Sequence, residues 1–320
     1  MKIAVMDGRG VNPGDLSWKP FEELGELSVY DRTPLEDMDE LLRRTEGAEV
    51  LLINKTPLDR ALLTRLAPTL RYVGVLATGY NVVDVQAAKE LGITVTNIPS
   101  YGTAAVAQYT MALLLELCHR IGDHNRSVQA GDWAACPDFC YWLTPQTELA
   151  GKTFGIVGYG RIGKAVAKLA SAFGLRVLAY TRSGKGDEFA QAVTLDTLLK
   201  ESDIISLHCP LFEETRNLID RENIAKMKDG VMILNTARGP VVNENDLAEA
   251  LKAGKVRGAA VDVLCQEPAR KDNPLIGLEN CIVTPHMAWA PLESRQRLLN
   301  VAVENLKAWM KGEAQNVVSL

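Results

Sequence analysis

The sequence predicts an α/β protein built from parallel sheets with helices on both faces, the doubly wound arrangement. Short β-branched runs alternate with helical patterns through most of the 320 residues. A glycine-rich turn joins one of these runs to a helix pattern, and polar residues of catalytic types follow several later runs. The length is sufficient for two domains at roughly 150 residues each.

The first third of the chain reads as βα repetition, which favours a parallel sheet. Strands are expected at Lys2–Met6, Leu27–Tyr30, Val50–Ile53, Tyr72–Ala77 and Thr94–Thr96, and helices at Pro34–Arg44, Asp59–Leu66 and Asp84–Leu91. The longest helix signal follows, at Ala104–Arg120; it is mostly apolar, so we expect it to be buried between domains. The next segment, Gly131–Ala150, is polar and aromatic without a clear period.

The alternation then restarts and continues almost to the end of the chain. Strands are expected at Thr153–Val157, Arg176–Tyr180, Ile204–Leu207, Val231–Asn235, Gly258–Val263 and Ile282–Thr284, and helices at Ile162–Phe173 and Pro291–Lys311. This pattern places a domain boundary near Pro99–Ala104 and leaves the last helix unassigned to either domain.

Composition limits the classes of partner. Lys and Arg together number 35 and Asp and Glu 40, for a net charge of −5. Nucleic acids and anionic membranes both favour a basic surface, so we expect neither as a partner. None of the six cysteines forms a Cys-x-x-Cys, and we expect neither a disulfide framework nor a metal. The opening run Met1–Met6 is too short for a signal peptide, which indicates a cytoplasmic protein.

The glycine-rich turn, Gly158–Gly163, matches Gly-x-Gly-x-x-Gly and lies directly between a predicted strand and a predicted helix. In dinucleotide-binding proteins the first glycine permits the turn, the second lets the backbone approach a pyrophosphate, and the third packs helix against strand. The helix N-terminus offers unpaired N–H groups to the phosphates. An ordinary strand–turn–helix connection is the alternative interpretation.

The segment after the next strand bears on the choice of cofactor. An acidic residue usually binds the adenosine ribose there, but Thr181-Arg182-Ser183-Gly184-Lys185 contains no carboxylate. Two cations and two hydroxyls could instead hold a 2′-phosphate, so we favour NADP over NAD. The alternative is a solvated basic turn without a role in cofactor choice.

Three polar residues follow later strands of the same predicted sheet, at the edge where open α/β sheets bind ligands. His286 comes after Ile282–Thr284, Arg238 after Val231–Asn235, and Glu267 after Gly258–Val263. Hydride delivery to a ketone builds up negative charge on oxygen and calls for an acid and a cation, which His286 and Arg238 supply. A carboxylate beside His286 would favour its charged form. Taken singly, each residue also has an ordinary structural interpretation: His286 as a loop residue, Arg238 as a helix cap and Glu267 as a surface residue. His208 follows another strand and could line the cofactor crevice or be structural.

Together these motifs resemble the D-2-hydroxyacid dehydrogenase family, from about Lys2 to Met310. The resemblance implies that Arg238 binds substrate and polarises its carbonyl, that His286 is the acid/base and that Glu267 supports it. It also implies that Asp262 binds the nicotinamide amide. The substrate carboxylate would be bound by the loop residues Leu76, Ala77, Thr78 and Gly79. The cofactor-binding residues that we expect are Gly158, Gly160, Arg161, Ile162, Gly163, Thr181, Arg182, Ser183, His208, Pro210, Thr236, Ala237, Asp262 and His286.

The resemblance also implies an architecture. A substrate domain split between residues 1–99 and 291–320 would be flavodoxin-like, and an inserted Rossmann-like domain, residues 100–290, would bind NAD(P). The active site would lie in the cleft between them. A homodimer is implied, with Ala104–Arg120 and the aromatic segment near its interface.

Within the family, three segments are similar to the glycerate dehydrogenase/hydroxypyruvate reductase branch. They are Val106–Gln108, Asp138–Cys140 with the following Glu148–Lys152, and His286–Ala290. We therefore expect reduction of hydroxypyruvate or glyoxylate, with D-lactate-type or branched-chain 2-hydroxyacid dehydrogenation as the alternative. An NAD(P)H-sensing binding protein is the alternative from another class. Trp142 and Trp289 either pack at an interface or reach an active site.

Overall fold

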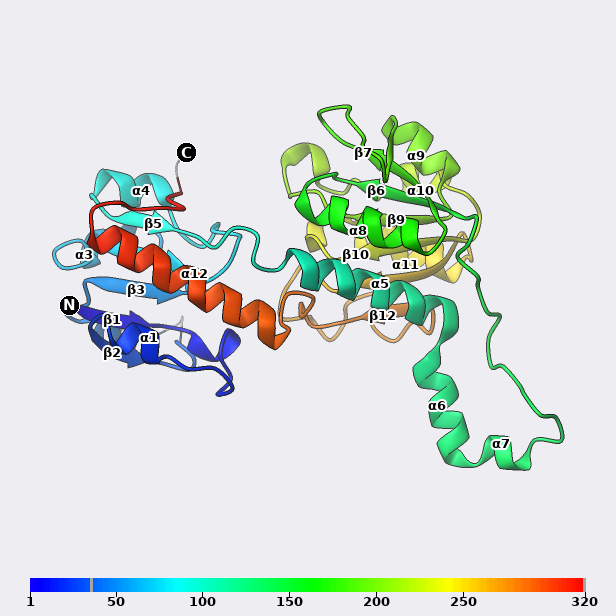
Figure 1. Ribbon diagram of the computed structural model, residues 1–320, viewed down its shortest axis with the longest axis horizontal. Helices are drawn as coiled ribbons and strands as arrows, with labels where there is room; N and C mark the ends of the chain where they lie inside the picture. The colour runs from blue at the N-terminus through cyan, green and yellow to red at the C-terminus, as the bar shows by residue number, and fades with distance from the viewer. Residues whose placement is uncertain (35–36, 319–320) are drawn as a thin grey trace. The chain divides into compact units, whose positions relative to one another are not determined.

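The computed structural model describes residues 1–34 and 37–318 (Figure 1). The chain divides into two compact units, unit 1 (Met1–Gly102 with Ala290–Leu320) and unit 2 (Thr103–Trp289). Each unit contains one sheet whose strand pairs are all parallel, which confirms the predicted fold class. Within the described part of the chain, no helix is long and apolar enough to cross a membrane.

Unit 1 has a five-stranded sheet in the order β2-β1-β3-β4-β5. Its strands are β1 (Lys2–Val5), β2 (Glu26–Val29), β3 (Val50–Ile53), β4 (Tyr72–Val75) and β5 (Thr94–Thr96). Every residue of β3 and β4 is buried, as continuous apolar runs at the centre of a covered parallel sheet require. The strand order reverses between β1 and β3, which is a flavodoxin-like arrangement.

The helices of unit 1 are α1 (Lys19–Glu22), α2 (Met38–Thr45), α3 (Arg60–Leu66), α4 (Val85–Glu90) and α12 (Leu292–Met310). The start of α2 is capped by the Asp37 carboxylate, so the predicted helix begins later than Pro34; Leu35 and Glu36 lie outside the described residues. Helix α12 closes the unit, since Arg295 pairs with Asp15 at 2.7 Å and Trp309 packs on Tyr72.

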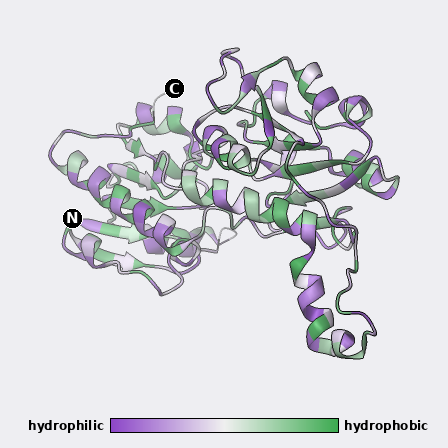
Figure 2. Ribbon diagram, turned by 45° about the vertical axis from the view of Figure 1, so that its right-hand side comes forward, coloured by the Kyte–Doolittle hydropathy of each residue, from purple (hydrophilic) through white to green (hydrophobic). Residues whose placement is uncertain are grey.

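Unit 2 has a seven-stranded sheet in the order β12-β11-β10-β9-β6-β7-β8. Its strands are β6 (Thr153–Val157), β7 (Arg176–Tyr180), β8 (Gln191–Ala192), β9 (Ile204–Leu207), β10 (Val231–Asn235), β11 (Val256–Val261) and β12 (Cys281–Val283). One apolar core lies under α5 (Thr103–His119) and α8 (Arg161–Ala172). A second lies on the opposite face, under α9 (Leu195–Glu201), α10 (Arg221–Lys226) and α11 (Glu244–Lys252), so the sheet is doubly wound. Figure 2 shows the apolar strands inside each unit and the polar outer faces of the helices.

The middle of the chain contains one long helix, which the sequence predicted, and two shorter helices, which it did not. The apolar residues of α5 pack against α8 and the sheet inside unit 2; that α5 is buried between the domains stays a prediction. The chain then forms α6 (Ile121–Ala130) and α7 (Asp132–Ala135), where no helix was predicted. These helices and the return segment 136–146, which we call the arm, project from unit 2 (Figure 1).

Candidate active site

The three glycines of the turn after β6 have three different surroundings. Gly158 has φ +95°, and a Cβ there would lie within 2.7 Å of the His208–Cys209 backbone. A Cβ on Gly163 would meet the Gly158 carbonyl oxygen, so this glycine lets α8 approach the strand. Gly160 has an ordinary φ of −83°, and nothing lies within 4 Å of its Cβ position. Neither strain nor packing inside the chain requires glycine at 160, whereas a pyrophosphate approaching the backbone would.

The turn lies at the point where the strand order of unit 2 reverses, between β6 and β9. Open α/β sheets bind ligands at this switch point. His208 directly follows β9, its backbone N–H donates to the Val157 carbonyl at 2.8 Å, and its Nε2 lies 2.8 Å from the Ser206 hydroxyl. Burial lowers the pKa of His208 to about 3, so the imidazole is neutral at physiological pH. The neighbouring Pro210 is exposed.

The segment after β7 forms a turn in which the Thr181 and Ser183 hydroxyl oxygens lie 3.3 Å apart. The exposed Arg182 guanidinium lies 5.2 Å from the centre of the Phe212 ring, which belongs to the loop after β9. Its planar face therefore stacks on the aromatic ring while its N–H groups remain available for an anion. Hydroxyls and a guanidinium are groups that can bind a phosphate; that they hold an adenosine 2′-phosphate here stays a prediction.

Asp187, a carboxylate that the sequence interpretation did not use, is folded back against the glycine-rich turn. It accepts a hydrogen bond from the Tyr159 hydroxyl at 2.5 Å, and Lys164 of α8 lies 3.3 Å from it. Burial, with the adjacent carboxylate, raises the pKa of Tyr159. No local sequence pattern predicts the contact between Tyr159 and Asp187, because the two residues are 28 positions apart in the chain.

At the carboxyl ends of β10, β11 and β12 lie the three residues predicted to be catalytic. The Nδ1 atom of His286 lies 2.6 Å from Oε2 of Glu267. The other oxygen of Glu267 accepts the Leu264 backbone N–H at 3.1 Å, so the carboxylate has a fixed orientation. Both side chains are about a third exposed, at 30% and 35%, which leaves the pair accessible to a ligand. A carboxylate on one ring nitrogen orients the other, Nε2, for proton exchange.

Arg238 follows β10 and is exposed, and its Nη1 donates to the Ala237 carbonyl at 2.7 Å. None of the ion pairs found among residues 1–34 and 37–318 involves Arg238. A guanidinium without an internal carboxylate can bind an anionic ligand through its fork of N–H groups. Thr236, in the same turn, is buried, and its hydroxyl lies 3.0 Å from that of Thr110 on α5.

The segment Leu76–Gly79 belongs to unit 1, whereas every other predicted site residue belongs to unit 2. Three of its carbonyls are engaged: Leu76 accepts from Asn54, Ala77 from the Ile98 backbone and Thr78 from Asn97, at 2.7 to 3.0 Å. In the part of the chain that the structure describes, the backbone N–H groups of Ala77, Thr78 and Gly79 have no acceptor. Three adjacent unused N–H groups on a fixed loop have the chemistry to accept a carboxylate, which stays a prediction for this loop.

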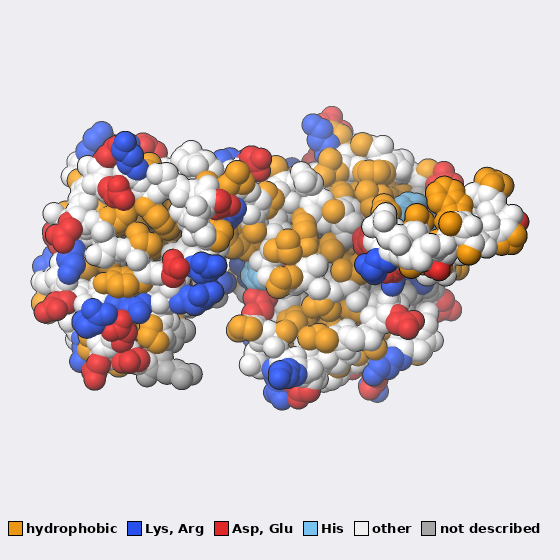
Figure 3. Space-filling view, turned by 90° about the horizontal axis from the view of Figure 1, so that it is seen from below, with side chains coloured by type: hydrophobic (Ala, Val, Ile, Leu, Met, Phe, Trp, Pro, Cys, Tyr) orange, Lys and Arg blue, Asp and Glu red, His pale blue; other side chains and the backbone are white. Residues whose placement is uncertain are grey.

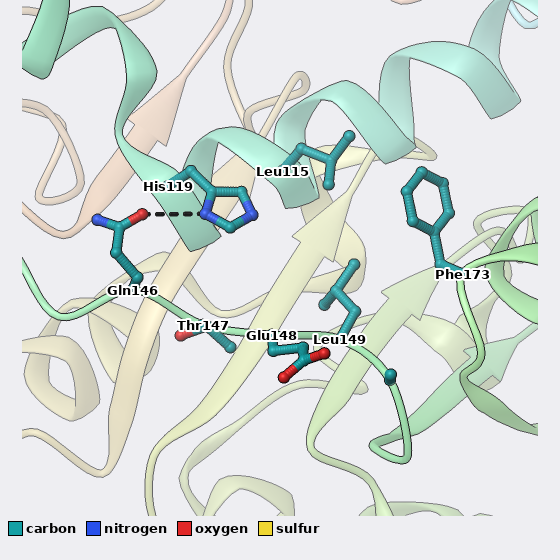
Figure 4. A pocket seen from close by; sticks show the side chains of 8 residues that line it. Leu115, His119, Gln146, Thr147, Glu148, Leu149 and Phe173 are labelled. Carbon is teal, nitrogen blue, oxygen red and sulfur yellow. Dashed lines mark hydrogen bonds between the residues drawn. The ribbon is translucent and has the colours of Figure 1, made fainter.

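A pocket elsewhere on unit 2 contains none of these residues. It lies beside the end of α5 and the segment 146–150, where His119 Nδ1 lies 3.0 Å from Gln146 Oε1 (Figure 4). Its lining is completed by Leu115 and Phe173. A second hollow shares His119 and Gln146 and reaches the arm residues Tyr141 and Trp142. Both hollows therefore belong to the surface beside the arm.

Two further residues at the strand ends hold the turns of the site, a role that the sequence did not predict: Asn235 was not singled out, and Asp262 was expected only to bind the cofactor. Asn235, the last residue of β10, and Asp262, directly after β11, are each 1% exposed and hold the turns that carry Arg238 and His286. That Asp262 binds the nicotinamide amide stays a prediction; its carboxylate accepts three hydrogen bonds from this chain.

Comparisons with known proteins identify the family to which the chain belongs. Residues 111–288 match the model of the D-isomer specific 2-hydroxyacid dehydrogenase, NAD binding domain. The chain is 55% identical to hydroxypyruvate reductase of Blautia hydrogenotrophica, with 100% of both chains covered. It is 44% identical to glycerate dehydrogenase of Methylorubrum extorquens, over 99% of this chain and 98% of that one. The crystal structure of TT0316 protein from Thermus thermophilus is similar, with a TM-score of 0.87, 38% identity and 100% coverage of both chains. The chain therefore belongs to the D-isomer specific 2-hydroxyacid dehydrogenase family.

Proposed function

We propose that the protein uses NAD(P)H to reduce a small 2-keto acid, either hydroxypyruvate to D-glycerate or glyoxylate to glycolate. The observation that carries the proposal is the His286–Glu267 pair, 2.6 Å apart. The two residues follow the neighbouring strands β12 and β11, and β11 in turn pairs with β10, which leads to Arg238. The identity to hydroxypyruvate reductase and glycerate dehydrogenase supports the choice of substrate.

The residues have separate roles in this proposal. A bound nicotinamide would supply the hydride, and the glycine-rich turn would hold the cofactor through Gly158, Gly160 and the start of α8. Arg238 would polarise the keto oxygen, and the Nε2 atom of His286 would hold the proton that this oxygen receives. The N–H groups of Ala77, Thr78 and Gly79 would hold the substrate carboxylate.

We infer that NADPH is preferred over NADH. The support is the pair of hydroxyls at Thr181 and Ser183 beside Arg182, together with the engagement of Asp187 by Tyr159 and Lys164. A carboxylate that already accepts from a tyrosine hydroxyl and pairs with a lysine is less available to a ribose 2′-hydroxyl.

We further propose a homodimer formed through the arm. Large apolar side chains are exposed along it, and Figure 3 shows hydrophobic side chains gathered on this projection. They are Ile121 (61%), Trp133 (51%), Phe139 (89%), Trp142 (66%) and Leu143 (51%). The hollows beside His119 and Gln146 lie on the same unit, so two copies could exchange arms about a two-fold axis. Sedimentation should show a dimer that Phe139→Glu dissociates, while Met38→Glu, on exposed α2, leaves it intact.

The six cysteines are all unpaired thiols, which supports our proposal of a reducing, cytoplasmic location. Thiol titration of freshly isolated protein in denaturant should count six reactive groups.

The test of the catalytic proposal is initial-rate reduction of hydroxypyruvate, glyoxylate, pyruvate and 2-ketoisocaproate, each with NADPH and with NADH. The highest kcat/KM is expected with hydroxypyruvate or glyoxylate. Preference for 2-ketoisocaproate or pyruvate would favour a branched-chain or D-lactate-type enzyme with the same machinery. Cofactor binding without turnover of any keto acid would instead indicate an NAD(P)H sensor.

A further inference from the structure

Two buried polar side chains stand at the ends of the neighbouring strands β10 and β11. Asn235 is the last residue of β10 and Asp262 follows β11, and each is 1% exposed. Buried polar groups are costly unless they are hydrogen-bonded, so their partners reveal their roles. In both cases the partners are the backbones of the turns that carry Arg238 and His286.

Asn235 closes the Arg238 turn from both sides. Its Oδ1 accepts the Ala237 backbone N–H at 3.0 Å, and its Nδ2 donates to the Arg238 carbonyl at 2.9 Å. One amide therefore uses its acceptor and one of its donors on the same three-residue turn. An aspartate of the same shape could not donate to the Arg238 carbonyl.

Asp262 does the same for the His286 turn. Its Oδ1 accepts the Thr284 hydroxyl at 2.7 Å and the Met287 N–H at 2.9 Å, and its Oδ2 accepts the Ala288 N–H at 2.8 Å. The Asp262 carbonyl accepts the His286 N–H at 2.8 Å. His286 has φ +52°, a left-handed conformation that a residue with a Cβ adopts rarely, and bonds on both sides hold it there.

The two side chains belong to one connected unit. We call the hydrogen bonds of Asn235 to the Arg238 turn and those of Asp262 to the His286 turn the two clamps. The Asp262 backbone N–H donates to the Asn235 carbonyl at 2.9 Å, and this hydrogen bond joins the two clamps. Beside it, a Cβ on Gly239 would meet the Leu264–Cys265 peptide, which places the Arg238 turn directly against the loop that leads to Glu267. A change in either turn would therefore be transmitted to the other.

We propose that Asn235 and Asp262 are positioning residues that fix Arg238 and His286 relative to each other. The proposal rests on the catalytic roles proposed above for Arg238 and His286. It assigns the Asp262 carboxylate mainly to the His286 turn, since an acceptor-only group matches the three donors that it meets. Displacement of a reacting group by about 1 Å can cost on the order of 100-fold in rate, so the clamps control kcat.

Asn235→Asp and Asp262→Asn test the proposal because each keeps its shape and exchanges one hydrogen-bonding function. We expect kcat to fall about 10- to 100-fold in each, with the Kd of NADPH, from cofactor fluorescence, changing less than about threefold. Asn280→Asp is the matched control: Asn280 precedes β12, at the opposite end of the strands, and its Nδ2 donates to the Leu251 and Arg257 carbonyls. It should lower the urea midpoint without lowering kcat.

A double-mutant cycle with His286→Gln separates positioning from general damage. If Asp262 acts through His286, Asp262→Asn should reduce kcat little further in the His286→Gln background. Full additivity, or a rise in the Kd of NADPH that accounts for the whole loss in kcat/KM, would overturn the positioning role in favour of direct cofactor binding.

A measurement without substrate keeps this inference distinct from the proposed function. The chain has four histidines, so the ring nitrogens of His286 can be assigned in long-range ¹H–¹⁵N spectra by their loss in His286→Gln. Asp262→Asn should shift these signals and Asn280→Asp should not. Shifted signals in a protein that turns over no keto acid would uphold the positioning and refute the function. Unshifted signals with unchanged kcat in an active enzyme would refute the positioning alone.

Discussion

The Nδ1 atom of His286 lies 2.6 Å from Oε2 of Glu267, and the remaining Glu267 oxygen is held by the Leu264 backbone N–H. The carboxylate thus orients the imidazole from one side, while the loop that precedes Glu267 orients the carboxylate. This arrangement makes the loop 263–267 part of the catalytic machinery that we propose, although most of its side chains touch no reacting atom.

Removal of the imidazole should abolish the proposed proton transfer without damaging the cofactor site. We expect His286→Gln to lower kcat by about 10²- to 10⁴-fold, and Glu267→Gln by a smaller factor, since the glutamine can still orient the ring. Stopped-flow and steady-state rates with the best keto acid provide the measurement, with the Kd of NADPH as the control. Wild-type kcat in His286→Gln would remove His286 as the proton donor.

Gly239→Ala should damage the site through the backbone. The added methyl group would collide with the Leu264 carbonyl and the Cys265 nitrogen, so the peptide that holds Glu267 must move. We expect kcat to fall at least about 10-fold. Gly122→Ala is the control, because its Cβ would have ordinary contacts of 3.4 Å or more within a helix, and activity should persist. Equal activity in both variants would contradict this account of the turn.

Gly160 and Gly163 should respond differently to the same substitution. Gly160→Ala meets nothing within 4 Å, so the unfolding free energy should be unchanged while the methyl group obstructs the pyrophosphate and raises the Kd of NADPH. Gly163→Ala meets the Gly158 carbonyl oxygen and should lower the urea midpoint itself. Urea melts and fluorescence titrations of both variants test the assignment; a normal Kd in Gly160→Ala would place the pyrophosphate elsewhere.

Cofactor preference should depend on the turn after β7. Thr181→Asp places a carboxylate where it can accept from a ribose 2′-hydroxyl and repel a 2′-phosphate. We expect the ratio of kcat/KM for NADPH to that for NADH to fall by about 10-fold or more. Thr64→Asp, the same charge change on exposed α3 of unit 1, should leave the ratio unaltered. An unchanged ratio in Thr181→Asp would refute the role of this turn.

The partly buried His208 should make the fold acid-sensitive. Its pKa is lowered from 6.5 to about 3, so below pH 6.5 the unfolded chain binds a proton that the folded chain excludes. The free energy of unfolding should therefore decrease as the pH falls from about 6.5 towards 3, by roughly 1 kcal/mol per pH unit from this group. Urea denaturation at pH 7, 5.5 and 4.5 should show a smaller loss in His208→Gln; an identical loss would assign the effect to other groups.

The sequence predicted the fold class and most elements because apolar periodicity and strand-end residues are local features. Helix α6 was not predicted, because its ends depend on the left-handed conformations of Arg120 and Gly131 and its middle, Asp123 to Arg126, is polar. The contact between Glu267 and His286 could be anticipated because both residues follow neighbouring parallel strands. The hydrogen bonds of Asn235, Asp262 and Asp187 could not, because they depend on which loops fold back upon which strands.

The construction of unit 1 from two distant stretches has a consequence for synthesis. Its sheet is covered by α12 and its β5 edge is paired by Val318, which donates to the Val95 carbonyl at 2.9 Å. All of unit 2 lies between these stretches, so a nascent chain can complete the nucleotide-binding unit while the first sheet still lacks its last helix. During this interval the buried face around Tyr72 is open to solvent. Unit 1 therefore begins to be translated first but finishes folding last, and its incomplete sheet is the surface that chaperones would meet on the ribosome.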